Sequence, residues 1–183
     1  MGKIHPFVDD ALAAWLGEQH VFFVATAPSG DGGHVNCSPK GRDSFRVLGP
    51  TTVAYRDFTG SGIETVAHVR DNGRIVLMFC AFAGAPRIVR LHGRGEVVTA
   101  QHEDYAGLQQ RFGRREPGVR AIVRVELTRI ADSCGFGVPL LRYEGERDTL
   151  PKWAEQKGED GVVRYVREKN AASIDGLPGL SAK

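Results

Sequence analysis

The sequence predicts a mainly β protein, an antiparallel Greek-key sheet or barrel with flanking helices. Short runs of strand-forming residues alternate with turns, and the 23 glycines are spread through the chain instead of being gathered in one segment. The predicted strands, roughly six or seven in number, mostly follow one another directly along the chain. A parallel Rossmann-type sheet, in which a helix follows each strand, is therefore disfavoured.

The first predicted element is a short amphipathic helix. Leu12, Trp15 and Leu16 recur at the spacing of one helix face. Asp9 and Asp10 stand just before them, where the dipole of a helix N-terminus favours negative charge.

The predicted strands are runs of apolar and β-branched residues bounded by turn residues. They cover residues 21–26, 34–38, 45–48, 51–55, 74–82, 87–98 and 119–130. A Gly/Asp-rich turn joins the first two into a hairpin, and Gly49-Pro50 joins the next two.

Three further helices are predicted between and after the strands. Ser61 and Glu64 have the spacing of a capping box, and Asn72-Gly73 is a typical helix end. A second helix is expected over 102–112 and a charged one over 150–169. Residues 1–183 are thus expected to form a single domain, with a helical C-terminal tail from about residue 150 and a Gly/Pro-rich terminal coil.

Composition excludes several classes of protein. The chain has 183 residues and a formal net charge of +2, which does not indicate a nucleic-acid-binding surface. It contains no 18-residue apolar stretch and no signal-peptide pattern, so neither membrane insertion nor export is expected. The cysteines Cys37, Cys80 and Cys134 form no C-x-x-C pair and the histidines have no metal-site spacing, so we expect a cytoplasmic protein without a metal.

A glycine-rich turn, Thr59-Gly60-Ser61-Gly62, is the first candidate site. It follows a predicted strand and opens a predicted helix, so backbone N–H groups and the helix dipole would favour a phosphate there. It is neither a Walker motif nor a complete G-x-G-x-x-G. An ordinary helix start remains the alternative.

The second candidate site is the segment Asn36 to Arg42. A strand ending in Ser-Pro-Lys-Gly presents a hydroxyl, a free carbonyl and a cation at a bend, and Lys40 and Arg42 could attract an anionic ligand. The alternative is a hairpin end with solvated charges.

Two other features are weaker candidates. Arg87, Arg90 and Arg94 make a basic stripe that could contact nucleic acid, but such stripes more often pair with carboxylates across a sheet. Cys134 lies between glycine-rich neighbours and could be a nucleophile. No local group would stabilise its thiolate, so a small packed thiol in a tight turn is the preferred interpretation.

Several phrases of the sequence, taken together, resemble the pyridoxamine 5′-phosphate oxidase-like FMN-binding split-barrel family. They are His34-Val-Asn-Cys-Ser-Pro-Lys-Gly41, Tyr55-Arg-Asp-Phe-Thr-Gly-Ser-Gly62, Glu64-Thr65, Asn72-Gly-Arg74, Arg90-Leu-His-Gly93 and Cys134-Gly-Phe-Gly-Val-Pro139. The resemblance covers roughly residues 5 to 145, and the tail is typical of an uncharacterised subgroup.

This resemblance implies a six-stranded antiparallel split barrel of Greek-key type and a homodimer with FMN between its protomers. The flavin-binding residues that it implies are Val35, Asn36, Cys37, Ser38, Lys40, Thr59, Ser61, Glu64 and Thr65. Glu64-Thr65 stand near the place of the Arg-Lys pair that the family carries at its phosphate site, so Glu64 is expected to turn back and cap the helix.

The function implied is that of an FMN-dependent oxidoreductase acting on a small-molecule substrate, with no catalytic side chain assigned. The Arg-x-His substrate segment of the true pyridoxamine phosphate oxidases is absent from this tail, so oxidation of vitamin B6 is not carried over. Two alternatives remain open at this point: a non-catalytic flavin-binding or flavin-storage protein, and a haem- or deazaflavin-binding relative.

Overall fold

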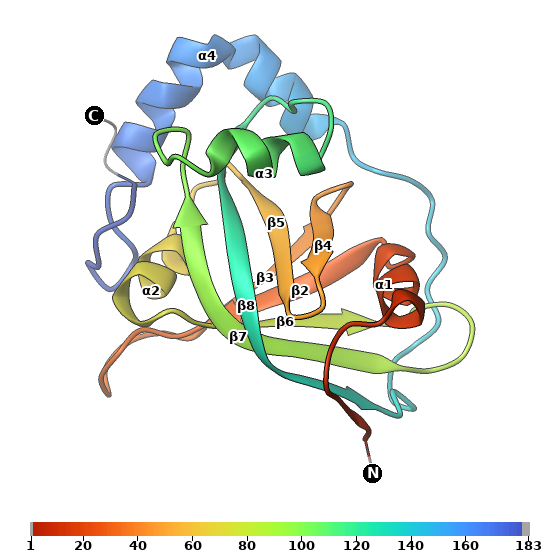
Figure 1. The fold of residues 1–183 in the computed structure, drawn as a ribbon. Helices are drawn as coiled ribbons and strands as arrows, with labels where there is room; N and C mark the ends of the chain where they lie inside the picture. Colours follow the sequence, from red (N-terminus) through yellow and green to blue (C-terminus); the bar gives the residue numbers. More distant parts are fainter. Residues whose placement is uncertain (1, 181–183) are drawn as a thin grey trace.

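The computed structural model describes residues 2–180 and confirms the mainly β class: a curled antiparallel sheet forms a half-open barrel with helices around it (Figure 1). The strands are β1 (Ile4–His5), β2 (Val21–Thr26), β3 (Asn36–Gly41), β4 (Phe45–Gly49), β5 (Thr52–Phe58), β6 (Arg74–Cys80), β7 (Ile88–Val98) and β8 (Val119–Ser133). Their order is β3-β2-β6-β7-β8-β5-β4, with β1 paired to β8.

The sheet has eight strands, where the family resemblance implied six. Every range expected to be a strand is one, with ends shifted by a few residues. The one strand outside the seven predicted ranges, β1, has only two residues, which is too short to show an alternating pattern in the sequence.

Four helices surround the sheet: α1 (Asp10–Gly17), α2 (Glu64–Asn72), α3 (Tyr105–Arg111) and α4 (Thr149–Lys169). The Asp9 carboxylate caps α1 by accepting a hydrogen bond from the Leu12 N–H at 2.8 Å. Gly73 ends α2 in the left-handed conformation, with φ of 71°, as Asn72-Gly73 predicted. Helix α4 is interrupted at Gly158, whose φ of 65° is not helical.

The predicted capping box of α2 is wrong. The helix begins at Glu64 with Ile63 at the N-cap, and no side chain caps it. Glu64 is therefore the first helical residue instead of the third, and the spacing from Ser61 places neither side chain in capping position.

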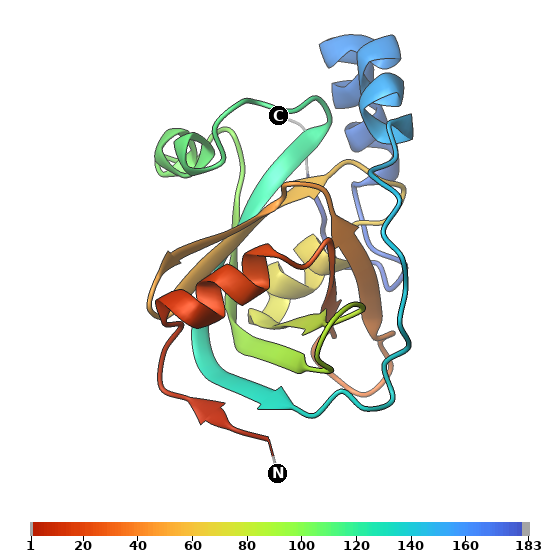
Figure 2. The ribbon, with the colours of Figure 1, turned by 90° about the vertical axis from the view of Figure 1, so that its right-hand side faces the viewer.

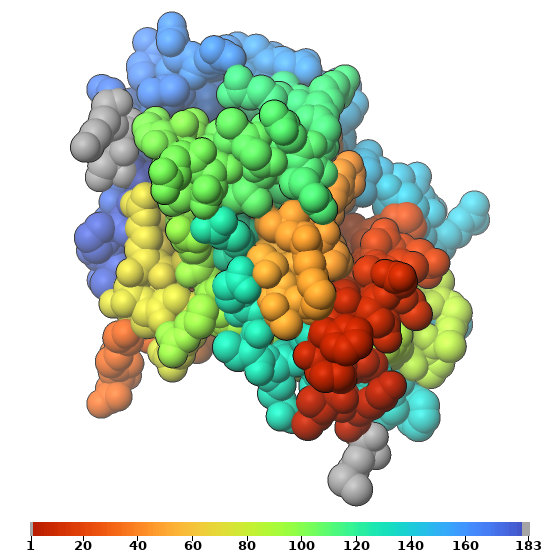
Figure 3. Space-filling view, in the orientation of Figure 1, coloured from red at the N-terminus to blue at the C-terminus, as the bar shows by residue number. Residues whose placement is uncertain are grey.

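The main core fills the inside of the curled sheet. Phe22, Tyr55 and Phe79 meet there, and α1 covers it with Leu12 and Leu16. On the outer face, α3 packs on β5, β7 and β8 in a second apolar cluster. Figure 1 shows α1 and α2 at opposite ends of the curled sheet, and Figure 3 shows α3, β4 and α1 packed along one face.

The barrel is held together across its open side by side chains. Strands β3 and β5 are not neighbours in the sheet, yet Lys40 Nζ on β3 lies 2.8 Å from Asp57 Oδ1 on β5. Asp57 is also held from β8, where Arg120 Nε lies 2.8 Å from Asp57 Oδ2. The Lys40–Asp57 ion pair therefore bridges the gap that strand pairing leaves between β3 and β5.

The chain after β8 wraps the barrel. Residues 138–148 run along the outside of the sheet to the start of α4 (Figures 1 and 2). Beyond α4 the tail returns to α2, where Leu180 packs on Ile63 and Val66. Within residues 2–180, no helix combines the length and apolar character needed to cross a membrane.

Candidate functional site

A cavity of about 480 Å³ lies where the start of β3 faces the turn before α2. Its lining residues are His34, Val35, Asn36, Cys37, Ser61, Gly62, Glu64 and Ile174. The fold therefore brings together both sequence segments that were candidate sites, although about 25 residues separate them along the chain.

The Asn36 side chain links the two segments. Its Nδ2 donates to Thr65 Oγ1 at 2.9 Å, and its Oδ1 accepts from the Ser38 hydroxyl at 3.1 Å. Behind it, Thr26 Oγ1 lies 3.0 Å from Nδ1 of the fully buried His68. Ser38 and Thr65, which do not line the cavity, thus position a residue that does.

The turn before α2 leaves a run of amide N–H groups without acceptors. Within residues 2–180, no N–H from Gly60 to Val66 donates a hydrogen bond, and α2 has no side-chain cap. These groups lie at a helix N-terminus, where the dipole adds positive potential. The turn can therefore bind an anion through its backbone.

Two buried side chains hold this turn from behind. Arg120 Nη1 donates to the Gly62 carbonyl at 2.8 Å and to Asn170 Oδ1 at 2.9 Å. Asn170 Nδ2 in turn donates to the Gly60 carbonyl at 2.9 Å. The hydrogen bonds to the Gly60 and Gly62 carbonyls fix the turn from its inner side. The Arg120 guanidinium also places a positive charge beneath the turn.

Glu64 and the C-terminal tail border the same turn. Glu64 Oε1 accepts from the Ile174 N–H at 3.4 Å. His34 Nδ1 lies 2.6 Å from Asp175 Oδ1, and this hydrogen bond is the main reason that the pKa of Asp175 is lowered. The tail thus covers one side of the cavity and supplies Ile174 to its wall.

Lys40 and Thr59 lie away from this cavity. Lys40 and Arg120 both contact Asp57, which is fully buried. Burial alone would raise the pKa of Asp57, but the two cations override it and lower that pKa below its ordinary value of 3.8. Thr59 is buried, and its hydroxyl has no hydrogen-bond partner in the described part of the chain.

Arg120, Asn170 and Ile174 were missed by sequence reasoning. Asn170 and Ile174 are about 110 residues from the turn that they contact, and no local pattern indicates such a pairing. Of the three, Arg120 could have been found from the sequence. It stands near the start of the long apolar strand β8, and a charged side chain buried there needs a partner.

The weaker candidates have ordinary structural roles. Arg87 pairs with the Asp132 carboxylate on β8 at 3.1 Å, as expected, whereas Arg90 donates to the Ser133 hydroxyl and Arg94 to the Asn72 carbonyl. Cys134 lies in a tight bend, where Gly135 has a φ of 65° and packs on the backbone of Arg87. The expectation of a packed thiol is wrong, because this bend leaves Cys134 exposed. Between residues 2 and 180, no group of three or more His, Cys, Asp or Glu residues is placed to hold a metal ion.

Comparisons with known proteins agree with this fold. A family model described as pyridoxamine 5′-phosphate oxidase matches residues 8–134. The pyridoxamine 5′-phosphate oxidase family protein ustO of Aspergillus flavus is 42% identical over 189 residues, covering 94% of this chain and 76% of its own.

Two solved structures show the same architecture. HupZ of Group A Streptococcus has a TM-score of 0.52 at 26% identity, covering 67% of this chain and 90% of that protein. A crystal structure from Lactobacillus delbrueckii, described as a putative pyridoxamine 5′-phosphate oxidase, has a TM-score of 0.54 at 16% identity and covers 70% of this chain and 98% of that one.

Proposed function

The chain belongs to the pyridoxamine 5′-phosphate oxidase family, and we propose that it is an FMN-dependent oxidoreductase that acts on a small molecule. The observation that carries this proposal is the run of acceptor-free N–H groups from Gly60 to Val66, which borders a cavity also lined by β3. The family match alone would support a flavin, and the turn adds a place for its phosphate.

The residues around the cavity fit a flavin phosphate. The turn amides, with the hydroxyl of Ser61, are donors suited to phosphate oxygens, and Thr65 enters the proposal through the family resemblance. Arg120 lies behind the turn and offsets the repulsion between a phosphate and Glu64. A volume of about 480 Å³ also lies within the usual range for small-molecule sites.

The ring of the flavin would be held by β3. This strand is at one end of the sheet order, so its outer edge presents backbone N–H and C=O groups to the polar rim of an isoalloxazine. Asn36 and Cys37 at the start of this strand and Val35 just before it line the cavity, with Ser38 supporting Asn36. Lys40 and Thr59 enter the proposal through the family resemblance alone.

Bound FMN would supply the redox chemistry, by accepting a hydride at its N5 position. The protein would bind and orient it. The hydrogen bonds from Asn36 Nδ2 to Thr65 and from the Ser38 hydroxyl to Asn36 Oδ1 hold this amide in one orientation at the cavity wall. The tail, through Ile174, would limit access of water from one side.

A homodimer and a cytoplasmic location complete the proposal. Val35 is 75% exposed and Ile174 is 71% exposed, so the cavity has an apolar rim that a second copy of the chain would cover. The three cysteines are free thiols, which suits a reducing compartment.

The test is the absorption spectrum of the purified protein during reduction. An oxidoreductase should be yellow, bleach when a nicotinamide hydride donor, NADPH or NADH, is added without oxygen, and recover its colour in air. A yellow protein that neither donor bleaches would show flavin storage instead of catalysis. A colourless protein that takes up no added FMN would refute the proposal.

A further inference from the structure

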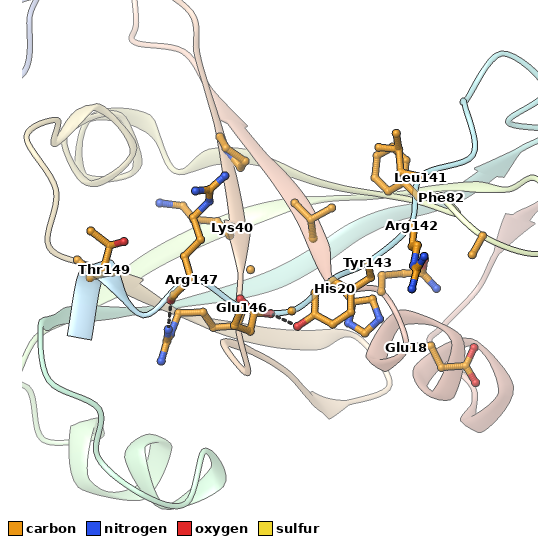
Figure 4. A pocket seen from close by; sticks show the side chains of 18 of the residues that line it. Glu18, His20, Lys40, Phe82, Leu141, Arg142, Tyr143, Glu146, Arg147 and Thr149 are labelled. Atoms are coloured by element: carbon orange, nitrogen blue, oxygen red, sulfur yellow. Dashed lines mark hydrogen bonds between the residues drawn. The ribbon is translucent and has the colours of Figure 1, made fainter. Parts of the chain in front are cut away.

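A second and larger cavity, of about 880 Å³, lies beside the other end of β3 (Figure 4). None of its lining residues belongs to the cavity described above. Residues 39–42 form one wall, residues 18–21 a second, and residues 141–150 with Trp153 the third. Apart from Lys40, which enters the flavin proposal through the family resemblance alone, the residues of this cavity have no role in the proposed function.

The third wall is an ordered segment. The Leu141 N–H donates to the Phe82 carbonyl at 2.9 Å, and Arg42 Nη1 donates to the Arg147 carbonyl at 3.0 Å. Between these points Tyr143 stacks on His20, with ring centroids 3.6 Å apart and planes 8° from parallel. The stack places a flat aromatic surface in the cavity wall (Figure 4).

Some charged side chains of the cavity lining have hydrogen-bond or ion-pair partners and others have none. Lys40 is engaged by Asp57, and Glu146 accepts from the Tyr143 hydroxyl at 3.1 Å. In contrast, the guanidinium groups of Arg142 and Arg147 have no hydrogen-bond or ion-pair partner within residues 2–180. They lie on either side of the His20–Tyr143 stack, and Glu18 is the remaining acid of the lining (Figure 4).

We propose that this cavity binds a flat, conjugated organic anion, such as an aromatic carboxylate, sulfonate or phosphate ester. The stacked pair, Phe82 and Trp153 offer the apolar and aromatic surface for its ring. Arg142 and Arg147 offer cations that bind carboxylate, sulfonate or phosphate oxygens in pairs of hydrogen bonds. A neutral ligand of the same shape would leave these charges unused.

Two fluorescent probes of similar shape test this. The first is 8-anilinonaphthalene-1-sulfonate, which carries a negative charge, and the second is N-phenyl-1-naphthylamine, which carries none. Binding is followed by calorimetry and by quenching of Trp153, with Trp153→Phe as the control that removes the signal and leaves Trp15. Flavin content is measured in parallel and need not change.

The variant is Arg142→Gln with Arg147→Gln, and its matched control is Arg115→Gln with Arg129→Gln. All four arginines are exposed, and the control pair lies outside the lining. Both double variants should keep the melting temperature of the parent, because these side chains have no partners to lose.

The proposal predicts one sulfonate probe per chain, with quenching of Trp153, and affinity about five- to tenfold weaker in the Arg142/Arg147 variant. The control variant should bind the sulfonate probe with the affinity of the parent. The neutral probe should bind the parent and both double variants with equal affinity. Equal binding of the sulfonate probe to all variants would overturn the proposal, as would stronger binding of the neutral probe or no quenching of Trp153.

Discussion

Replacing Lys40 by Met tests the role of the ion pair that crosses the open side of the barrel. Lys40 is 17% exposed and Asp57 is fully buried, so the substitution leaves a buried carboxylate with Arg120 as its remaining cation. Breaking a buried pair costs about 3–5 kcal/mol when no partner remains. With Arg120 retained we expect about 2–3 kcal/mol, which lowers the melting temperature by about 5–10 °C for a chain of this size.

The assay is thermal unfolding of the parent, Lys40→Met and the exposed-site control Lys169→Met across pH. The pKa of Asp57 is lowered in the folded state, so its ionised form stabilises the fold above the ordinary value of 3.8, and this contribution is lost as the pH falls through the folded pKa. The difference in melting temperature between the parent and Lys40→Met should therefore be largest near neutral pH and should become smaller below pH 3.8. If the two melting temperatures are equal, or differ by the same amount at every pH, the ion pair between Lys40 and Asp57 does not stabilise the fold and the reasoning is refuted. If Lys40 also held the flavin phosphate, FMN affinity would fall while riboflavin affinity stayed constant.

Three other substitutions or measurements follow from the same structure. Asn170→Ala should cost about 1–3 kcal/mol of stability, because the Gly60 carbonyl and Arg120 each lose a partner, and it should weaken FMN more than riboflavin. A variant that binds both flavins like the parent would show that the turn does not depend on this side chain. Cys134→Ala should keep flavin and turnover, since the thiol is exposed and has no assigned role; complete loss of turnover in a folded variant would contradict this. Light scattering should give about twice the chain mass of 19.9 kDa at micromolar concentration, and the mass of a single chain would argue against the dimer.

Local signals were enough to predict the fold. Apolar runs and turn residues gave every strand from β2 to β8, and Gly73 marked the end of α2, because these features depend on residues close together in sequence. The start of α2 was misplaced by the same kind of signal. Ser61 and Glu64 have the right spacing, but the chain does not enter the helix until Glu64.

The sequence alone predicted the two segments that form the site, but it did not predict that they meet at a cavity. Asn36 and Ser61 were both chosen from the sequence, and the fold places both in the lining of one cavity. The contacts that shape the wall are long-range. Asn170 reaches the turn from about 110 residues away, and Lys40 pairs across the barrel with Asp57, which no spacing rule relates to it.

Calorimetric titration of the purified apoprotein with FMN and with riboflavin tests the central claim most directly. The two ligands share the ring and differ in the phosphate that the Gly60–Val66 amides would bind. Charge-assisted hydrogen bonds of about 1.5–3 kcal/mol predict that FMN binds about ten- to a hundredfold more tightly than riboflavin. Equal affinity for the two ligands would contradict a phosphate site at this turn, and failure of both to bind would contradict the flavin function itself.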